Sequence, residues 1–385
     1  MKSTAASVGV LIALLAAPPT AAGAPAWEWR IPNWAPRPLV PADNPMTAEK
    51  VELGRYLFYD KRLSIDGTMA CATCHRQKSA FTDGRRQAVG ATGETHPRNA
   101  MGLANIAYFS VLTWADPGLT ALEIQALTPL FGEHPIEMGL AGRKESMLRL
   151  FGRDPRYERL FRAAFADDDP FSITNLTRAL AAFERTLVSF NSPWDRYRHA
   201  GIRDAISAPA KRGAALFFSE RLACFHCHGG INLTDAVMHE RLAKPELGFH
   251  NNGLYNLGRR GAYPAENTGT FAHTGKAEDM GRFRTPSLRN VAVTAPYMHD
   301  GSIASLGEVI DHYAAGGRTI HTGPNRGVGA KNPHKSMFIA GFRLSAREKA
   351  DLIAFLESLT DRTFLENPAH ADPFERGGPA SAPTR

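Results

Sequence analysis

Two Cys-x-x-Cys-His strings constrain this chain more than any other feature of its sequence. They are Cys71-Ala-Thr-Cys74-His75 and Cys224-Phe-His-Cys227-His228, and they contain all 4 cysteines of the 385 residues. Two thiols at this spacing reach the two vinyl groups of a haem, and the adjacent histidine meets the iron as its proximal ligand. The sequence therefore predicts two covalently bound haem c groups, and it leaves no thiol for a disulfide.

Two other chemistries use paired cysteines, and both fit this sequence less well. Cys71 and Cys224 are 153 positions apart, and this spacing does not match the ligand spacings of a zinc site. A thioredoxin-like redox pair would not need a histidine after both motifs. Covalent haem is the interpretation that uses every residue of the two motifs.

The segments before the two motifs are repeats of one another. Residues 54–63 and 213–222 share Gly, Leu, Phe, Arg and Leu at equivalent positions, and each segment runs into a haem motif. Helix-start signals precede both copies, Thr47 in the first and Ser207 before Pro209 in the second. We therefore predict a mainly α-helical chain of two tandem cytochrome c-like domains, each with one covalent c-type haem.

The ends and the middle of the chain set the predicted domain boundaries. Lys2 is followed by an apolar stretch and then by small residues, which is the pattern of an export signal. Ser192-Pro193 and Gly201 interrupt the helical pattern between the repeats. We expect a signal peptide at 1–26, an N-terminal haem domain at 27–200, a C-terminal haem domain at 201–372 and a disordered tail at 373–385.

Hydropathy and charge limit where the protein can be located and which partners it can bind. The apolar stretch near the N-terminus is too short to span a bilayer, and no later segment approaches the roughly 20 apolar residues that a spanning helix needs. The formal net charge is +7, but no run of five or more basic residues occurs. We expect a periplasmic protein that is not an integral membrane protein and does not bind nucleic acid.

Further helices are predicted where apolar residues recur at three- and four-residue spacing, as in the run from Leu176 to Leu187. Ser345 and Glu348 form a capping box before another such run. Strand signals are few, and residues 245–270 resemble a long loop over a site.

Haem content alone does not decide the function. An iron with a vacant sixth position can take peroxide or oxygen, whereas an iron with two protein ligands mainly passes electrons. Composition does not choose between an enzyme and a plain electron carrier.

Several strings outside the haem motifs resemble the bacterial di-haem cytochrome c peroxidases and the MauG enzymes. They are Trp114, Gln125-x3-Pro129, Pro135-Ile-Glu137-Met-Gly139, Thr285-Pro-Ser-Leu-Arg289-Asn and Thr294-Ala-Pro296-Tyr-Met-His299-Asp-Gly301. Residues 40–46, 113–117 and 129–133 resemble the MbnH branch, whose members oxidise tryptophan on a copper-associated partner protein, MbnP. The resemblance covers nearly all of the chain that follows the predicted signal peptide.

The resemblance implies that the N-terminal haem, with His75 as its proximal ligand, is the peroxide site. Glu137 would be the distal acid/base, because a carboxylate can take a proton from peroxide and deliver it to the leaving oxygen. Gln125 and Pro129 would belong to the same catalytic site. Two extra residues after Gln125 leave Glu133 as a reserve candidate, and from the residues alone either glutamate would be explained by capping or solvating a loop.

Many di-haem peroxidases carry a loop histidine that blocks the peroxide iron until the enzyme is reduced. It lies eight positions before the residue equivalent to Asn99, and here that position is Ala91. His96 lies in the same loop at a different spacing, for which we favour a surface role. The resemblance therefore implies an open, five-coordinate haem at this site, as in MauG.

At the C-terminal haem, His228 is one expected ligand and Tyr313 is the other. Tyr313 lies 14 residues after His299, where the resemblance places Met in peroxidases and Tyr in MauG. Packing of a capped helix that begins after Ser305 would also explain this tyrosine, and His312 is the rival ligand. A phenolate favours high iron oxidation states, so a tyrosine ligand suits storage of oxidising equivalents.

The resemblance also implies roles for residues between the two haems. Trp114 would relay electrons, and Arg289 and His299 would lie near haem propionates. One Ca²⁺ is expected between the domains, because neutral oxygen ligands suit a hard cation. Its expected ligands are Asn99, Thr294 and Pro296.

Together these residues predict a periplasmic di-haem peroxidase of MauG/MbnH type. It would use hydrogen peroxide to form a high-valent di-haem state and would oxidise a tryptophan on a periplasmic, copper-associated partner like MbnP. The alternative is a di-haem cytochrome c peroxidase that detoxifies hydrogen peroxide with electrons from a small cytochrome or cupredoxin. A non-catalytic electron carrier is least favoured, because Ala91 leaves one iron open.

Overall fold

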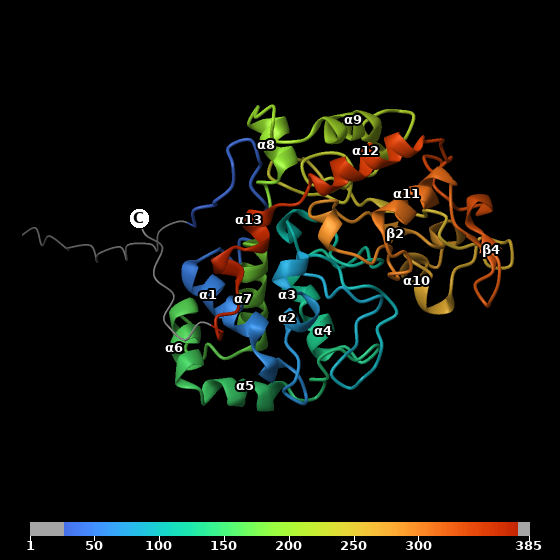
Figure 1. The fold of residues 1–385 in the computed structure, drawn as a ribbon. Helices are drawn as coiled ribbons and strands as arrows, with labels where there is room; N and C mark the ends of the chain where they lie inside the picture. The colour runs from blue at the N-terminus through green and yellow to red at the C-terminus, as the bar shows by residue number, and fades with distance from the viewer. Residues whose placement is uncertain (1–26, 376–385) are drawn as a thin grey trace, which may run out of the picture.

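The computed structural model describes residues 27–375, so the predicted signal peptide and residues 376–385 of the predicted tail lie outside the described part. Within the described part the chain is mainly helical, as predicted (Figure 1). The α-helices are α1 (Ala48–Tyr59), α2 (Cys71–Cys74), α3 (Leu122–Gln125), α4 (Leu127–Phe131), α5 (Lys144–Gly152), α6 (Pro155–Ala164), α7 (Ile173–Arg185), α8 (Pro193–His199), α9 (Ala208–Phe217), α10 (Phe271–Thr274), α11 (Leu306–Ala314), α12 (Ala346–Glu357) and α13 (Arg362–Leu365).

Short 3₁₀ turns and two small sheets complete the fold. The 3₁₀ turns are η1 (Lys61–Leu63), η2 (Gln77–Ser79), η3 (Ile106–Tyr108), η4 (Cys224–His226), η5 (Ala265–Asn267), η6 (Ala277–Asp279), η7 (Val291–Val293), η8 (Gly329–Lys331) and η9 (Pro368–His370). The strands are β1 (Phe249–His250), β2 (Phe283–Arg284), β3 (Thr319–Ile320) and β4 (Gly327–Val328). β1 pairs antiparallel with β2, and β3 pairs antiparallel with β4. Residues 245–270 are mostly irregular, as predicted, and contain β1 and η5.

The predicted helix starts are confirmed. The Thr47 side chain accepts a hydrogen bond from the backbone N–H of Lys50 and caps α1, and Ser207 caps α9 in the same way. Ser345 and Glu348 form the predicted capping box at the start of α12, and Ser305 caps α11. Each cap satisfies backbone donors that the first helical turn leaves unpaired.

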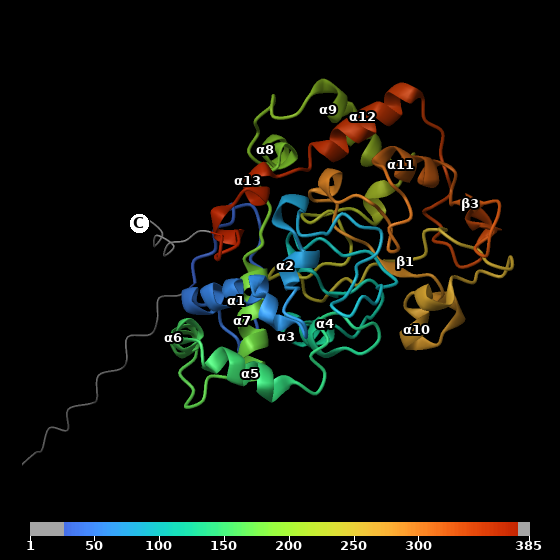
Figure 2. The same cartoon turned by 60° about the horizontal axis from the view of Figure 1, so that its bottom comes forward.

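The repeat found in the sequence corresponds to two equivalent helix pairs. α1 packs against α7, and α9 packs against α12 (Figures 1 and 2). A Cβ atom on Gly54 of α1 would lie 1.9 Å from the Ala179 carbonyl oxygen, and one on Gly213 of α9 would lie 1.9 Å from the Asp351 carbonyl oxygen. The shared glycine of the repeat therefore lets the helix that precedes each haem motif contact the backbone of its partner helix: α1 contacts α7, and α9 contacts α12.

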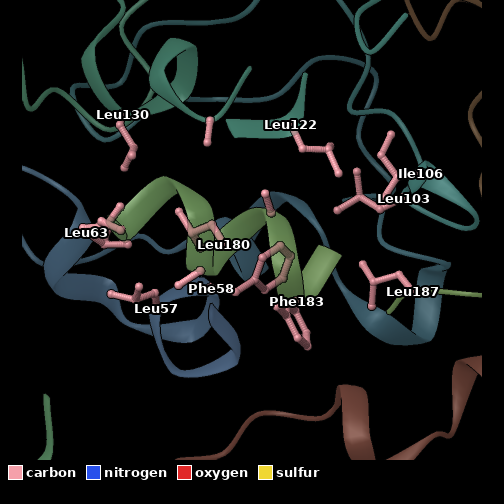
Figure 3. Close-up of a cluster of buried hydrophobic side chains, with 14 of the residues drawn as sticks. Leu57, Phe58, Leu63, Leu103, Ile106, Leu122, Leu130, Leu180, Phe183 and Leu187 are labelled. Atoms are coloured by element: carbon pink, nitrogen blue, oxygen red, sulfur yellow. The ribbon is translucent and has the colours of Figure 1, made fainter. Parts of the chain in front are cut away.

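Each helix pair carries its own hydrophobic core. Around α1 and α7, the side chains of Leu57, Phe58, Leu180 and Phe183 point toward one another (Figure 3). The second core forms around α9 and α12 and includes Phe217 and other buried residues. Two separate cores, each behind one haem motif, fix the motifs on rigid supports.

The helical pattern is interrupted between the repeats, as predicted, because α7 ends at Arg185 and α9 begins at Ala208. A short helix that was not predicted lies in this segment: the Ser192 side chain accepts from the Asp195 N–H and caps α8, with Pro193 at the first helical position. Proline is tolerated there because the N–H that it lacks would have no helical partner. Trp194 of α8 is buried in the second core, so the link is partly a packed helix.

The last helices return to the first core. Phe364 of α13 belongs to that core, and the Tyr59 hydroxyl donates to the His370 carbonyl at 2.6 Å. Gln77 Nε2 donates to the Asn367 carbonyl at 2.8 Å. Residues within the range 201–372 therefore pack on the N-terminal half of the chain. Among residues 27–375, no helix is both long and apolar enough to cross a bilayer.

Candidate functional site

The two motif histidines are held in the same way. His75 Nδ1 lies 2.8 Å from the Phe81 carbonyl oxygen, and His228 Nδ1 lies 3.1 Å from the Leu233 carbonyl oxygen. Both acceptor residues have positive φ, 64° and 50°, so the same left-handed backbone conformation turns the chain back toward each histidine. A carbonyl that accepts from Nδ1–H leaves Nε2 as the free ligand atom. Burial lowers the pKa of both imidazoles and favours the neutral form that binds iron.

The cysteines of the two motifs lie on different local structures. Cys71 and Cys74 begin and end α2. Cys224 begins the 3₁₀ turn η4, which ends directly before Cys227. All four are free of disulfides, as thioether bonds to haem vinyl groups require.

A cavity of about 460 Å³ lies at the second motif. Cys224, Cys227 and His228 line it, and Tyr313 of α11 also lines it. Its remaining walls are largely apolar, and they include Leu288, Val291, Leu306, Val309, Ile310, Leu352 and Leu356. A haem is an apolar plate with two carboxylates, so the walls of this cavity suit its ring.

Two buried donors without partners fit the carboxylate edge of a haem. Arg284 is 2% exposed and His299 is 3% exposed, and both line the cavity. Arg284 Nη1 and His299 Nε2 have no hydrogen-bond partner among the described residues. Burial lowers the pKa of Arg284 to about 9 and that of His299 to about 3. Unpaired buried donors are costly, and a propionate would satisfy them.

Arg289 lies in the same wall, but its guanidinium already has protein partners. Its Nη1 lies 2.9 Å from Asp195 Oδ2, and its Nε donates to the Ile231 carbonyl at 3.0 Å. A contact between Arg289 and a haem propionate therefore stays a prediction. Sequence reasoning missed Arg284, although it directly precedes the Thr285-Pro-Ser-Leu string that the resemblance used.

The rival ligands Tyr313 and His312 occupy different surroundings. His312 is buried outside the cavity wall, where its Nε2 lies 3.1 Å from the Asn252 carbonyl oxygen. Tyr313 faces the cavity, and burial, the largest cause, raises its pKa to about 12. A bound ferric ion would oppose that effect by stabilising the phenolate. The geometry favours Tyr313 over His312 as the partner of His228.

Glu137 lies at the first motif, on a segment held by α4. The Met138 N–H donates to the Pro129 carbonyl at 2.9 Å, and the Glu137 carbonyl accepts from the Ala91 N–H at 2.7 Å. Burial is the largest cause of the raised pKa of Cys71 and of Cys74, and the charge of Glu137 adds a smaller effect in both. Burial raises the pKa of Glu137 to about 7.

The other sequence-predicted residues of this site are placed as follows. Glu133 is exposed, whereas Glu137 is half-buried, so the geometry favours Glu137 as the more enclosed carboxylate. Gln125 is the last residue of α3 and is half-buried, and its contact with a substrate stays a prediction. His96 is partly exposed, and its Nε2 lies 3.8 Å from Glu137 Oε1, so the surface role that we favoured stays a prediction.

Trp114 and the expected calcium ligands share one wall of the large cavity. Trp114 Nε1 donates to the Asn99 carbonyl at 2.9 Å, and the Asn99 N–H donates to the His299 carbonyl at 2.8 Å. Thr294 and Pro296 line the same cavity as these residues. The structure therefore brings the three oxygen-bearing residues near Trp114, and calcium binding stays a prediction.

Known proteins with similar sequences belong to one family. A family model described as di-haem cytochrome c peroxidase matches residues 48–202. The methylamine utilization protein MauG of Methylorubrum extorquens is 36% identical over 335 residues, which cover 86% of this chain and 83% of that protein. Cytochrome-c peroxidase IdrP1 of Denitromonas iodatirespirans is 37% identical over 377 residues, which cover 92% of each protein.

A solved structure gives the same assignment for the fold. It is described as a MauG-like protein associated with microbial copper homeostasis, and it is 49% identical to this chain with a TM-score of 0.88. The match covers 91% of this chain and 100% of that one. With two haem motifs, equivalent supporting helices and relatives along most of its length, the chain belongs to the di-haem cytochrome c peroxidase and MauG family of haem-dependent oxidoreductases.

Proposed function

We propose that this protein is a periplasmic di-haem enzyme of MauG and MbnH type that uses hydrogen peroxide to oxidise a tryptophan on a copper-associated partner protein. The partner would resemble MbnP. Support comes from the 49% identity to a MauG-like protein that is associated with copper homeostasis. The observation that carries the proposal is Tyr313, which lies in the wall of the cavity that contains His228.

Tyr313 distinguishes two uses of the second haem. A thioether ligand would stabilise reduced iron and suit an enzyme that receives electrons from a small carrier. A phenolate carries a negative charge and stabilises oxidised iron, which suits an enzyme that takes electrons from its own protein substrate. The position of Tyr313 in the wall of the same cavity as His228 therefore favours oxidation of a partner.

Glu137 would move the proton in the peroxide step. Each haem supplies, once attached, an iron that exchanges electrons, and the iron beside His75 would be the one open to peroxide. With a pKa near 7, the Glu137 carboxylate would take up a proton of hydrogen peroxide and return it to the oxygen that leaves as water. The haem would supply the electrons for cleavage of the O–O bond.

The complete reaction balances in electrons and protons. One hydrogen peroxide takes up two electrons and two protons and becomes two molecules of water. The partner tryptophan supplies both electrons and takes up the oxygen of one water molecule, and the two protons released in that step replace the two that peroxide consumes. Trp114 donates to the Asn99 carbonyl and lines the same cavity as Tyr313, and an indole there would relay electrons.

The second candidate is peroxide detoxification with electrons from a small cytochrome or cupredoxin. It is favoured by the 37% identity to a cytochrome-c peroxidase over 92% of both chains. The two functions differ in the electron donor: a partner that is permanently modified in one case, and a carrier that is only re-oxidised in the other.

Mass spectrometry of the partner tests the proposal. Holoenzyme with both haems is incubated with peroxide and a copper-associated candidate partner, and peptides of the partner are then mapped. We expect oxygen-containing mass changes on a partner tryptophan that depend on both enzyme and peroxide. Turnover with a reduced small cytochrome and no partner modification would instead establish the peroxidase function.

A further inference from the structure

Two buried tyrosines lie side by side, next to residues that line the large cavity. Tyr255 and Tyr263 are each 4% exposed, and their ring centroids lie 5.4 Å apart. The ring of His299, which lines the cavity, lies 6.5 Å from that of Tyr255 and 6.3 Å from that of Tyr263. Both tyrosines belong to one cluster of packed buried side chains that also contains Trp114 and Phe283. The two phenols are therefore close to the residue that would relay electrons in the proposed function.

The two hydroxyls have different hydrogen-bond acceptors. The Tyr255 hydroxyl donates to Asp300 Oδ2 at 2.5 Å, whereas the Tyr263 hydroxyl donates to Asn251 Oδ1 at 2.8 Å. A carboxylate can take a phenolic proton and become a neutral acid, but an amide oxygen is a very weak base. Of the two tyrosines, only Tyr255 can pass its proton to the group that it already contacts.

The Asp300 carboxylate is available to take that proton. It is 4% exposed, and it accepts from the Tyr255 hydroxyl and, at 3.1 Å, from the Ser302 N–H. Burial raises the pKa of Asp300, but the neighbouring His299 and the hydrogen bond from Tyr255 lower it further. Near neutral pH the carboxyl group is therefore ionised and can act as a base.

A second tyrosine–carboxylate pair lacks these properties. The Tyr157 hydroxyl donates to Asp60 Oδ2 at 2.7 Å, but the same oxygen lies 2.6 Å from Arg62 Nη2. A proton on Asp60 would leave the guanidinium without its ionic partner. Tyr157 also belongs to the core around α1 and α7 rather than to the cluster of Trp114. We therefore assign a structural role to the pair of Tyr157 and Asp60.

The charge of Arg318 couples loss of the electron to loss of the proton at Tyr255. The guanidinium carbon of Arg318 lies 4.8 Å from the centre of the Tyr255 ring. A cation over an aromatic face is attracted by the electrons of the ring, so a ring that lost only an electron would repel it. Burial, followed by the charge of Asp300, raises the pKa of Tyr255. The phenol therefore keeps its proton until an electron leaves, and then releases it to Asp300.

We infer that Tyr255 is a proton-coupled redox site that removes oxidising equivalents from the enzyme when no partner protein is bound. The inference rests on the proposed function, in which peroxide leaves two oxidising equivalents at the haem sites. In one step, an electron passes from Tyr255 through Trp114 to the haem sites, and the phenolic proton moves to Asp300 Oδ2. The products are a neutral tyrosyl radical and a protonated Asp300.

A one-electron reductant such as ascorbate completes the cycle. It supplies an electron to the radical, and Asp300 returns the proton to Tyr255, so both residues recover their first state. Two such cycles remove both oxidising equivalents. The reductant then supplies the two electrons that peroxide takes up, and the two protons come from the reductant and solvent. The tyrosyl radical is therefore a short-lived species that follows the high-valent state.

Electron paramagnetic resonance tests this inference in the holoenzyme with both haems and without a partner. Enzyme that contains ring-deuterated tyrosine is mixed with peroxide and frozen at intervals while the peroxide-induced spectrum decays. We expect a tyrosyl signal, which the label narrows and so distinguishes from a tryptophan radical. The signal should form more slowly in D₂O, because a proton moves with the electron, and ascorbate should remove it.

Three variants assign the signal. Tyr255→Phe keeps the ring but removes the proton, so the signal should be lost and the peroxide-induced spectrum should persist longer. Asp300→Asn keeps the phenol but removes the base, so it should also lose the signal. Tyr263→Phe is the matched control and should keep the signal, because Tyr263 has the same exposure and cluster but bonds to an amide.

The same samples separate this inference from the proposed function. Wild type without a tyrosyl signal, an unchanged signal in Tyr255→Phe or Asp300→Asn, or an equal loss in Tyr263→Phe would overturn the role of Tyr255. Equal decay of the peroxide-induced spectrum in wild type and Tyr255→Phe would also overturn it. A wild-type haem spectrum that does not respond to peroxide would instead contradict the proposed function.

Discussion

The two haem motifs are alike on the side of the ligand histidine and different on the opposite side. His75 and His228 both present Nδ1 to the carbonyl of a residue with positive φ. Near the first motif, Glu137 has His96 beside it, whereas the phenol of Tyr313 lines the largely apolar cavity of the second motif. The shared half would attach a haem, and under the proposed function the differing residues would give the two irons different chemistry.

The largest expected effect tests the shared half. Replacing Cys71 and Cys74 with Ala should leave one covalent haem, because all four cysteines belong to the two motifs. Intact mass of the denatured protein measures this directly, with wild type expected to retain two haems. Wild-type protein with one haem or none would show that the motifs are not equivalent attachment sites.

The next effect tests the first of the differing halves. Glu137→Gln preserves size but removes the proton acceptor, so the peroxide reaction should slow by about 10²–10⁴-fold with haem content unchanged. Rapid-mixing spectra with peroxide give the rate. Glu133→Gln is the control, because that side chain is exposed and should behave as wild type. If Glu133→Gln slowed the peroxide reaction and Glu137→Gln did not, the acid/base role would belong to Glu133.

The pH dependence of the same rate sharpens the comparison. Burial raises the pKa of Glu137 to about 7, so below that pH the group becomes protonated and cannot accept the peroxide proton. The rate should fall about tenfold for each pH unit below the pKa and reach a plateau above it. Glu137→Gln should lose this dependence. A wild-type profile that is flat from pH 5 to 8 would contradict the acid/base role.

The smallest effects concern the repeat itself. Gly54→Ala and Gly213→Ala would each place a Cβ atom 1.9 Å from a backbone oxygen of the partner helix. Each should lower the free energy of unfolding by about 1–3 kcal/mol through overpacking. Thermal unfolding of the holoenzyme measures this. Gly152→Ala is the control, because its nearest neighbour would lie at 3.9 Å and no loss is expected. A neutral effect at only one site would break the equivalence of the helix pairs.

The sequence predicted those parts of the fold that depend on local chemistry. The caps at Thr47, Ser207 and Ser345 are confirmed, because a side-chain oxygen next to the first turn acts within three residues. The break at Ser192-Pro193 is confirmed, but the sequence did not predict that α8 begins there, since that short helix depends on the packing of Trp194 in the second core.

Contacts between distant segments were beyond reach of the sequence. His96 and Glu137 are 41 positions apart, and their approach depends on docking of a hairpin through Gly90. Arg284 belongs to no motif, and its Nη1, which has no partner among residues 27–375, is recognised only once the cavity around it is known. Spacing identified the attachment residues, whereas tertiary packing determined the surroundings of the two irons.

The most direct test of the account is the Mössbauer spectrum of peroxide-treated enzyme, compared between wild type and Tyr313→Met. If Tyr313 is the ligand opposite His228, wild type should hold both oxidising equivalents on the two irons. The variant should lose that signal at the second iron, because a neutral thioether stabilises reduced iron instead. An unchanged high-valent signal in Tyr313→Met, together with unchanged oxidation of the partner tryptophan, would show that Tyr313 only packs and would contradict the proposed difference between the two sites.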